Sequence, residues 1–222
     1  MSRNKLERFA ENKTFPNFFE PDYDTIKQED FSLKGKWKKD FFNNTNPIVL
    51  ELGCGKGEYT TGLAEKYPNI NFIGIDRKGA RMWKGCKSSV EKGMKNAAFI
   101  RTQISHISHY FEQNEVSEIW ITFPDPQPKR SKVSKRLTSP LYLDFYGKII
   151  QPDGFIHLKT DNELLYEYTL GVIDGLQYKV IDKKSDIYSL EKIDENLLIE
   201  TAYEKKWKEQ GRKIYYIKFQ LS

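Results

Sequence analysis

Short apolar runs alternate with longer amphipathic stretches through most of the chain. Near-continuous apolar runs, each bounded by glycine, proline or polar residues, occur at residues 47–53, 69–76, 97–101, 117–123 and 155–161. Apolar residues at helical spacing occupy the stretches between and after them, at residues 57–68, 77–94, 104–113, 139–154 and 162–174. Strands that alternate with helices predict βαβ units and a parallel sheet. Because the runs are apolar at consecutive positions, we expect an α/β fold whose mostly parallel central sheet carries helices on both faces.

The last quarter of the chain departs from this pattern. Residues 176–184 and 213–221 each predict a strand, and residues 195–211 between them predict a helix. Because the closing strand alternates apolar and polar residues, we expect it to pair antiparallel at or near the edge of the sheet. Residues 1–46 carry aromatic, basic and turn residues without a clear period. We interpret them as a partly flexible extension of a single domain at 47–222.

The composition limits the class of protein. Of the 222 residues, 38% are hydrophobic and 30% are charged, and the net charge of +5 is too small to indicate a polyanionic partner by itself. No apolar stretch approaches the ~20 residues that cross a membrane, and the N-terminus lacks the apolar core of a secretory signal. We therefore expect a cytoplasmic protein with no membrane partner. The two cysteines, Cys54 and Cys86, are too few and too far apart for a zinc or disulfide framework, and we expect no metal.

A glycine loop at residues 53–57 follows the first apolar run. Gly53, Gly55 and Gly57 permit a tight turn and a close approach of the backbone to a ligand. The dinucleotide fingerprint G-x-G-x-x-G has its third glycine one residue later. Glu51 precedes the loop, and Asp76 ends the next strand, where a carboxylate can bind both hydroxyls of a ribose. These features indicate a nucleotide-like cofactor, although a structural turn beside solvated acids, or an NAD enzyme, fits the same residues.

A single aspartate follows the fourth apolar run. Asp125 lies between Pro124 and Pro126, which restrict the backbone and therefore the position of its carboxylate. A basic loop at residues 129–136 comes next, with the cations Lys129, Arg130, Lys132, Lys135 and Arg136. Cations beside the end of a strand can bind phosphates and attract a polyanion, whereas a charge run taken alone is more often a solvated loop. Because reactions that shift charge need preorganised polar groups, this segment is a candidate reaction site for a polyanionic substrate.

Five segments resemble bacterial tRNA (guanine-N7-)-methyltransferases in sequence and order. They are LELGCGKGEYTTGLA, FIGID, ITFPDPQPKRSKVSKRL, IHLKTDN and TAYEKKW, and the resemblance runs from about residue 48 to the C-terminus. The segment that contains F-P-D-P and the following lysines is the most specific. The resemblance implies a Rossmann-like class I methyltransferase fold with an antiparallel C-terminal strand, S-adenosyl-L-methionine as cofactor and tRNA as partner. It also implies methylation of guanine N7 at position 46, in the variable loop of tRNA.

The same resemblance implies roles for individual residues. Those matched to cofactor binding are Glu51, Gly53, Gly55, Asp76, Gln103 and Asp125, and Asp125 is also matched to catalysis. Those matched to substrate binding are Lys129, Asp161, Thr201 and Glu204. Two positions depart from the family pattern. Gln103 stands where the family often has an acid near the adenine. Gln127 stands where the family commonly has Trp or His after the second proline. Without the resemblance, residues 201–207 fit a capped amphipathic helix equally well.

The chemistry of guanine N7 decides what each acid is expected to do. N7 has a lone pair and no proton, so it can attack a sulfonium methyl group directly, and proximity and alignment become the main tasks. We expect Asp125 to orient the guanine or to stabilise the positive charge growing on its ring. We expect Asp161 to accept hydrogen bonds from N1 and N2 of the base.

Other classes of protein stay open from the sequence. They are a class I methyltransferase that acts on another RNA, a small molecule or a protein, a nucleic-acid-binding protein without activity, and a dehydrogenase. The basic loop disfavours a small-molecule or protein substrate, and the glycine spacing disfavours the dehydrogenase. The sequence is compatible with a monomer or a homodimer.

Overall fold

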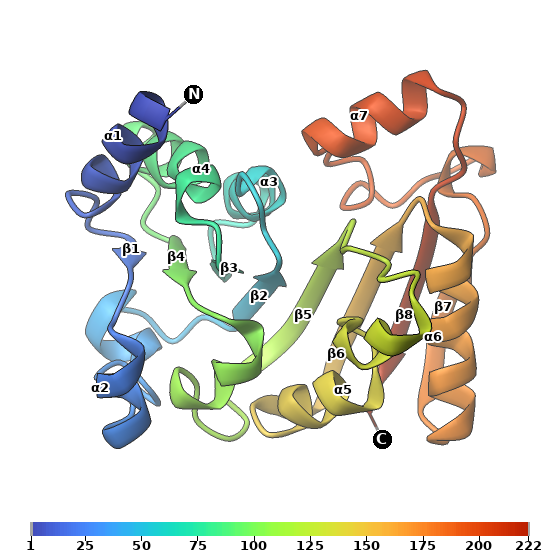
Figure 1. Ribbon diagram of the computed structural model, residues 1–222, viewed down its shortest axis with the longest axis horizontal. Coiled ribbons are helices and arrows are strands. Elements are labelled where there is room, and N and C mark those ends of the chain that lie inside the picture. The colour runs from blue at the N-terminus through green and yellow to red at the C-terminus, as the bar shows by residue number, and fades with distance from the viewer. Residues whose placement is uncertain (1, 222) are drawn as a thin grey trace.

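An eight-stranded sheet forms the centre of the protein (Figure 1). The computed structural model describes residues 2–221, with side chains from residue 5 onward. The strands are β1 (Phe18–Phe19), β2 (Ile48–Leu52), β3 (Asn71–Asp76), β4 (Ala97–Arg101), β5 (Val116–Thr122), β6 (Ile150–Thr160), β7 (Lys179–Lys184) and β8 (Tyr215–Gln220). Their order across the sheet is β1-β4-β3-β2-β5-β6-β8-β7.

The predicted mostly parallel sheet with an antiparallel C-terminal strand is confirmed. Neighbouring strands from β1 to β6 are parallel, and β8 is antiparallel to both of its neighbours. The closing strand β8 lies one place in from the edge, which β7 occupies. Every residue of β2 is buried, as expected for a strand that is covered on both faces.

Helices cover both faces of the sheet. They are α1 (Ser2–Asn12), α2 (Tyr23–Gln28), α3 (Glu58–Lys66), α4 (Gly79–Glu91), α5 (Pro140–Gly147), α6 (Glu163–Gly175) and α7 (Ala202–Glu209), with shorter turns at η1 (Trp37–Phe41), η2 (Ile104–His109), η3 (Arg130–Lys135) and η4 (Ile187–Ser189). Leu50 of β2 packs in one apolar cluster with Leu165 of α6, whereas Val49 packs in another with Leu63 of α3. Because successive strand residues point to opposite faces, the two clusters lie on opposite sides of the sheet. No helix within residues 2–221 is long and apolar enough to cross a membrane.

Three predicted helices are shorter than expected, among them the one predicted at 195–211, which forms α7. The stretch 104–113 forms only the 3₁₀ turn η2. The helix predicted at 139–154 ends at Gly147, and β6 takes up the residues from Ile150 onward. Gly154 permits the strand to pass there, because an added Cβ would lie 2.5 Å from an Ile150 side-chain carbon. Gly154 therefore fits the close packing of this strand, where a side chain would overlap its neighbours.

The N-terminal segment packs onto the domain without a regular sequence period. α1 lies against α4, and the two-residue strand β1 extends the sheet beside β4. An aromatic cluster holds the segment in place. Phe19 contacts the rings of Phe31, Trp37 and Phe41, and Trp37 also contacts the ring of Phe111. Ring contacts of this kind stabilise a segment without leaving a helix or strand period in its sequence. The predicted division into residues 1–46 and 47–222 stays a prediction, and its end residues Met1 and Ser222 lie outside the described part.

Candidate active site

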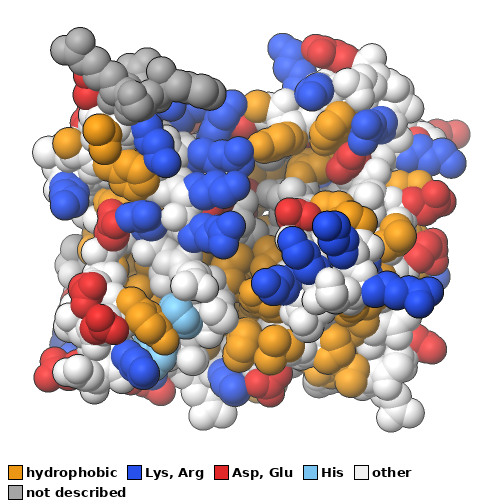
Figure 2. Space-filling model, viewed as in Figure 1, with side chains coloured by type: hydrophobic (Ala, Val, Ile, Leu, Met, Phe, Trp, Pro, Cys, Tyr) orange, Lys and Arg blue, Asp and Glu red, His pale blue; other side chains and the backbone are white. Residues whose placement is uncertain are grey.

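The carboxyl ends of the parallel strands meet at one edge of the sheet. Leu52, the last residue of β2, pairs with Ile75 of β3 and with Ile121 of β5, and Thr122 of β5 pairs with Lys159 of β6. The segments that follow these strands therefore lie side by side. They carry Gly53, Gly55, Asp76, Asp125 and Asp161. Figure 2 shows the surface indented between two groups of basic side chains, one over α3 and α4 and one over the loop after β5.

The glycine loop has an open face at its first two glycines. Gly53, Gly55 and Gly57 have φ values of 78°, 57° and 71°, in the left-handed region that favours glycine. A Cβ on Gly53 would meet only a Leu137 methyl carbon at 3.8 Å, and a Cβ on Gly55 only the Gly53 carbonyl oxygen at 3.9 Å, among the described atoms. A ligand can therefore approach this stretch of backbone closely. The contact with Leu137 also shows that the end of the loop after β5 folds back onto the glycine loop.

Gly57 serves packing instead of ligand approach. A Cβ there would lie 2.5 Å from Phe99 Cε1 and 3.2 Å from Gly85 Cα. We expect Gly57→Ala to lower the free energy of unfolding in urea by about 2–4 kcal/mol, from the left-handed backbone and the overlap together. The matched control is Gly93→Ala, which has φ 66° but no described atom within 4 Å of the added Cβ, so only backbone strain of about 1–2 kcal/mol is expected. Equal losses in the two variants would contradict the packing role.

Glu51 is buried at the end of β2, with 3% of its surface exposed. Its Oε2 accepts hydrogen bonds from the Thr60 amide at 2.8 Å and from the Thr60 hydroxyl, and its Oε1 accepts one from the Thr122 hydroxyl at 2.7 Å. Burial raises the pKa of Glu51 from 4.5 to about 7, although these hydrogen bonds favour the charged form. The carboxyl group therefore changes charge near neutral pH, directly before the glycine loop.

Asp76 ends β3 and faces the same loop. Its Oδ2 accepts a hydrogen bond from the Gly55 amide at 2.9 Å, and its Oδ1 accepts one from the Lys78 amide at 2.8 Å. Each oxygen keeps a further lone pair, so the carboxylate can still accept from two ribose hydroxyls. Gln103 is exposed at the start of η2, and it lines a cavity of about 630 Å³ together with Lys78. The structure thus brings both predicted residues to neighbouring parts of one edge.

The backbone on both sides of Asp125 fixes its carboxylate. Phe123 and Gln127 have φ values of 47° and 45°, and strained non-glycine residues of this kind are enriched at functional sites. The Gln127 amide donates to Asp125 Oδ1 at 3.0 Å, and the Phe123 amide donates to the Lys159 carbonyl oxygen at 2.8 Å. Oδ2 of this exposed side chain accepts no hydrogen bond from the described residues, which leaves it open to a ligand.

The basic loop contains exposed cations and one buried cation. The exposed ones are Lys129, Arg130, Lys132 and Lys135. Arg136 is only 5% exposed, and its guanidinium donates to the carbonyl oxygens of Pro126 at 3.0 Å and Gln127 at 3.3 Å. It also lies 4.2 Å from the centre of the Tyr168 ring. Arg136 therefore differs from its four exposed neighbours, because it binds the backbone at Pro126 and Gln127, next to Asp125.

Asp161 follows β6 and pairs with an arginine from the C-terminal part of the chain. Its Oδ2 lies 3.0 Å from Arg212 Nη1, with 17% of the Asp161 side chain and 47% of the Arg212 side chain exposed. The neighbouring Asn162 caps α6 by accepting a hydrogen bond from the Leu165 amide at 2.9 Å. Asp161 therefore stands at the start of a capped helix, on the same edge as Asp125.

The two remaining predicted residues belong to α7. The helix predicted at 195–211 begins only after Thr201, which caps it by accepting a hydrogen bond from the Glu204 amide at 3.2 Å. Glu204 is fully buried, and its carboxylate binds Lys159 Nζ at 2.6 Å and the Tyr188 hydroxyl at 2.9 Å. Burial raises the pKa of Glu204, and the ion pair with Lys159 opposes this rise. Substrate contact by Thr201 and Glu204 stays a prediction, while in the structure both fix α7.

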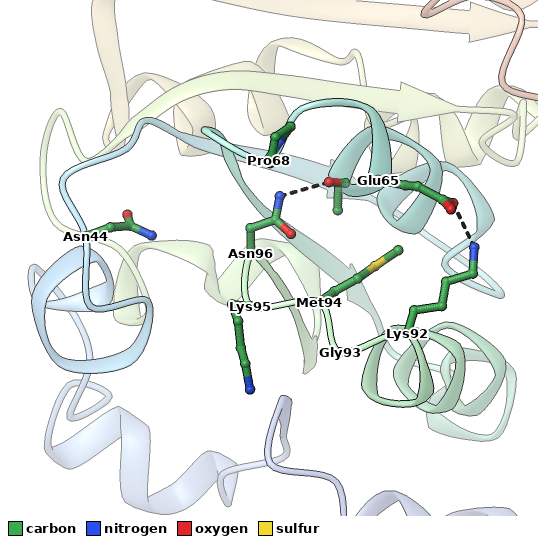
Figure 3. Close-up of a pocket in the computed structure, with 9 residues that line it drawn as sticks. Asn44, Glu65, Pro68, Lys92, Gly93, Met94, Lys95 and Asn96 are labelled. Atoms are coloured by element: carbon green, nitrogen blue, oxygen red, sulfur yellow. Dashed lines mark hydrogen bonds and ion pairs between the residues drawn. The ribbon is translucent and has the colours of Figure 1, made fainter.

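A second cavity, of about 530 Å³, lies away from this edge (Figure 3). Its lining residue Asn96 directly precedes β4, so the cavity is at the opposite, amino end of the strands. Lys92 pairs with Glu65 at 2.7 Å, whereas Figure 3 shows Lys95 pointing away from the other lining residues. No group of acids, histidines or cysteines among the described residues could hold a metal ion.

Some residues bind the predicted site acids, or the backbone beside them, and are not evident from the sequence. They are Thr60, Thr122, Arg136 and Arg212. Thr122 lies 71 residues from Glu51, and Arg212 lies 51 residues from Asp161, so no local spacing connects them. Thr60 is the exception, because a hydroxyl in the first turn after a glycine loop can reach back to the preceding strand end.

Comparisons with known proteins identify relatives of this chain. A family model described as "Putative methyltransferase" matches residues 45–217. The tRNA (guanine-N(7)-)-methyltransferase of Christiangramia forsetii is 50% identical over 221 residues, with 99% of each chain covered. That of Bacteroides thetaiotaomicron is 48% identical over 221 residues, with 100% of this chain and 87% of the relative covered.

Solved structures agree on the fold. The 16S rRNA methyltransferase KamB has a TM-score of 0.65 at 14% identity, with 88% of this chain and 95% of that chain covered. This likeness concerns the fold alone, and it confirms the predicted class I methyltransferase architecture. Together with the identity to the two relatives over nearly the whole length, these findings show that the chain belongs to the tRNA (guanine-N(7)-)-methyltransferase family.

Proposed function

We propose that this protein transfers the methyl group of S-adenosyl-L-methionine to N7 of guanine 46 in the variable loop of tRNA. Membership of the family supports this reaction, and one observation carries it in the structure. Asp125, held between two left-handed residues, lies at the same sheet edge as an open glycine loop and is followed by exposed cations. Cofactor, base and RNA backbone can meet there. We expect the protein to act in the cytoplasm, as a monomer or a homodimer.

The residues around the glycine loop fit the cofactor. Gly53 and Gly55 leave room where side chains would otherwise stand. Asp76 accepts hydrogen bonds from the ribose hydroxyls, and Gln103 accepts one from the exocyclic amine of the adenine through its side-chain carbonyl. Glu51 in its charged form favours a cationic ligand nearby. The cofactor supplies an electrophilic methyl group on a sulfonium.

Asp125 and Asp161 bind the guanine in this proposal. Because N7 carries a lone pair and no proton, the protein has to align the base and manage charge. Asp125 orients the base through its open Oδ2 and stabilises the positive charge that grows on the ring. Asp161 accepts from N1–H and N2–H, the edge that distinguishes guanine from adenine. A base in folded RNA must leave its stack to reach these groups.

Lys129→Ala is expected to weaken tRNA binding and to reduce the slope of log Kd against log salt concentration by about 1, because each phosphate contact releases about one counterion. Filter binding over a series of salt concentrations measures the slope. Lys95→Ala is the matched control, since it removes the same charge at the amino end of the strands (Figure 3). A slope in Lys129→Ala equal to that of the wild type would contradict the phosphate contact.

The reaction itself is tested by transfer of labelled methyl groups to unmodified tRNA, followed by mapping of the modified base. Label on N7 of the variable-loop guanosine would support the proposal. Label on another RNA, a protein or a small molecule would favour a different class I methyltransferase. No label, with cofactor binding intact, would contradict methyl transfer to tRNA.

A further inference from the structure

Two ion pairs join the end of β6 to α7 and the turn that follows it. Lys159 of β6 binds Glu204 of α7, and Asp161 binds Arg212 just beyond the end of α7. Lys159 is the last but one residue of β6, and Asp161 directly follows the strand. α7 and the turn that follows it are thus connected to the end of β6 at two points. The amide of Ala202 adds a third attachment, donating to Glu58 Oε2 of α3 at 2.7 Å.

The inner pair makes α7 a rigid element. Both Lys159 and Glu204 have fully buried side chains, and Lys159 Nζ also donates to the Leu197 carbonyl oxygen at 2.6 Å. The Tyr188 hydroxyl donates to Glu204 Oε1 at 2.9 Å, the oxygen that also lies 2.6 Å from Lys159 Nζ. Displacing α7 would leave a buried charge without its partner, which is strongly unfavourable. The position of α7 over the end of β6 is therefore fixed.

The outer pair is held in one geometry by α7. The guanidinium of Arg212 lies 3.9 Å from the centre of the Trp207 ring, and the Arg212 amide donates to the Trp207 carbonyl oxygen at 3.1 Å. Gly211, with φ 66°, forms the turn between helix and arginine. Arg212 occupies Oδ2 of Asp161, while Oδ1 accepts no hydrogen bond from the described residues. The carboxylate is thus oriented with one oxygen open.

We propose that Arg212, supported by Trp207 and by the buried Lys159–Glu204 pair, is a positioning residue that orients Asp161 to read the guanine edge. This inference rests on the proposed function, because it takes Asp161 as the acceptor for guanine N1–H and N2–H. A carboxylate fixed before the base arrives loses less freedom on binding and discriminates better between donor patterns. Thr201 and Glu204 then act through the position of α7.

A second ion pair near α7 serves for comparison with the Arg212–Asp161 pair. Lys208 and Glu200 pair at 2.7 Å, with 50% and 36% of their side chains exposed. Exposed pairs of this kind add little to stability. Both cations lie over an aromatic ring, Arg212 at 3.9 Å from the centre of Trp207 and Lys208 at 4.5 Å from that of Tyr188. The Arg212 pair is distinguished by its less exposed carboxylate, because 17% of the Asp161 side chain is exposed. The Arg212–Asp161 pair therefore matters for the orientation of the Asp161 carboxylate. Its loss should change the selection of the base much more than the free energy of unfolding.

The test measures Arg212→Ala with tRNA that carries guanosine or inosine at the target position. Inosine keeps N7 and N1–H but lacks the 2-amino group, so it reports on the edge assigned to Asp161. We expect Arg212→Ala to lower kcat/KM for guanosine by about 10- to 100-fold and to reduce the preference for guanosine over inosine. The Kd for S-adenosyl-L-methionine and the urea midpoint should not change. Arg212→Lys should recover part of the loss, and the control Lys208→Ala should behave as the wild type.

A double-mutant cycle with Asp161→Asn decides whether Arg212 acts through Asp161. If it does, Arg212→Ala has little further effect in the Asp161→Asn background. Equal effects in both backgrounds, or an unchanged preference for guanosine in Arg212→Ala, would overturn the inference while the wild type still methylates tRNA. A wild-type protein that transfers no methyl group to tRNA would overturn the proposed function, and this inference with it.

Discussion

Replacing Asp125 by alanine is expected to lower kcat by about 10²–10³-fold while changing the Kd for S-adenosyl-L-methionine by less than about threefold. A preorganised carboxylate that faces growing positive charge acts mainly in the transition state, so its loss appears in kcat. The cofactor would keep its contacts with Asp76 and the glycine loop. The loop around Asp125 would also keep its shape, because Arg136 binds Pro126 and Gln127 independently of the carboxylate. Single-turnover kinetics at saturating tRNA and calorimetric titration of the cofactor measure the two quantities.

Two further variants separate charge from geometry at this position. Asp125→Asn keeps an oxygen that can accept from the Gln127 amide but removes the charge. A large loss of kcat in Asp125→Asn as well would show that catalysis depends on the negative charge. Asp174→Ala, an exposed aspartate at the far end of α6, is the matched control. If Asp125→Ala turned over tRNA at nearly the wild-type rate, the carboxylate would be dispensable.

The sequence predicted those helices and strands whose own residues determine their secondary structure. The run Ile48–Leu52 is apolar at nearly every position, and the strand it predicts is buried throughout. The short strand β1 has no such signal, because its two residues pair with β4 where Phe19 packs against Trp37, a contact that no local period reveals. The strand Ile150–Thr160 is a third case, because it begins within a stretch whose apolar spacing predicted a helix. At such places tertiary contacts determine the secondary structure, and these contacts leave no local period in the sequence.

The candidate site also has some features that the sequence predicted and others that it could not show. Its acids stand directly after strands, and the sheet topology alone brings Asp76, Asp125 and Asp161 to one edge. Their partners come from distant segments, so the sequence could not show that Arg212 binds Asp161. Arg136 looked identical to its basic neighbours in the sequence, yet only the structure shows that it is buried and holds the loop. A charge run therefore predicts a basic surface without revealing which of its members are structural.

Glu51→Gln is expected to stabilise the cofactor-free protein above pH 7 by about 3 kcal/mol, because burial raises the Glu51 pKa from 4.5 to about 7 and each pKa unit corresponds to about 1.4 kcal/mol. The folded protein holds this proton more tightly than the unfolded chain. The contribution of Glu51 to stability is thus fully present below about pH 4.5 and is lost as the pH rises through about 7. Glutamine stays neutral and can keep the contacts, accepting from Thr60 and donating to the Thr122 hydroxyl. Urea denaturation at pH 5 should give similar stabilities, and at pH 8 the variant should be the more stable protein.

The same substitution should weaken the binding of S-adenosyl-L-methionine by about tenfold at pH 8, because the charged carboxylate favours a cationic ligand. In the wild type, affinity for the cofactor should rise as the pH increases from 6 to 8, since Glu51 loses its proton near pH 7. The variant should show no such rise. Glu167→Gln, which changes an exposed acid of α6, is the control for both measurements. If the pH dependence of stability were the same in Glu51→Gln and the wild type, another group would be titrating. If stability changed as expected but cofactor affinity did not, Glu51 would be a structural acid, held by Thr60 and Thr122, without a part in binding the cofactor.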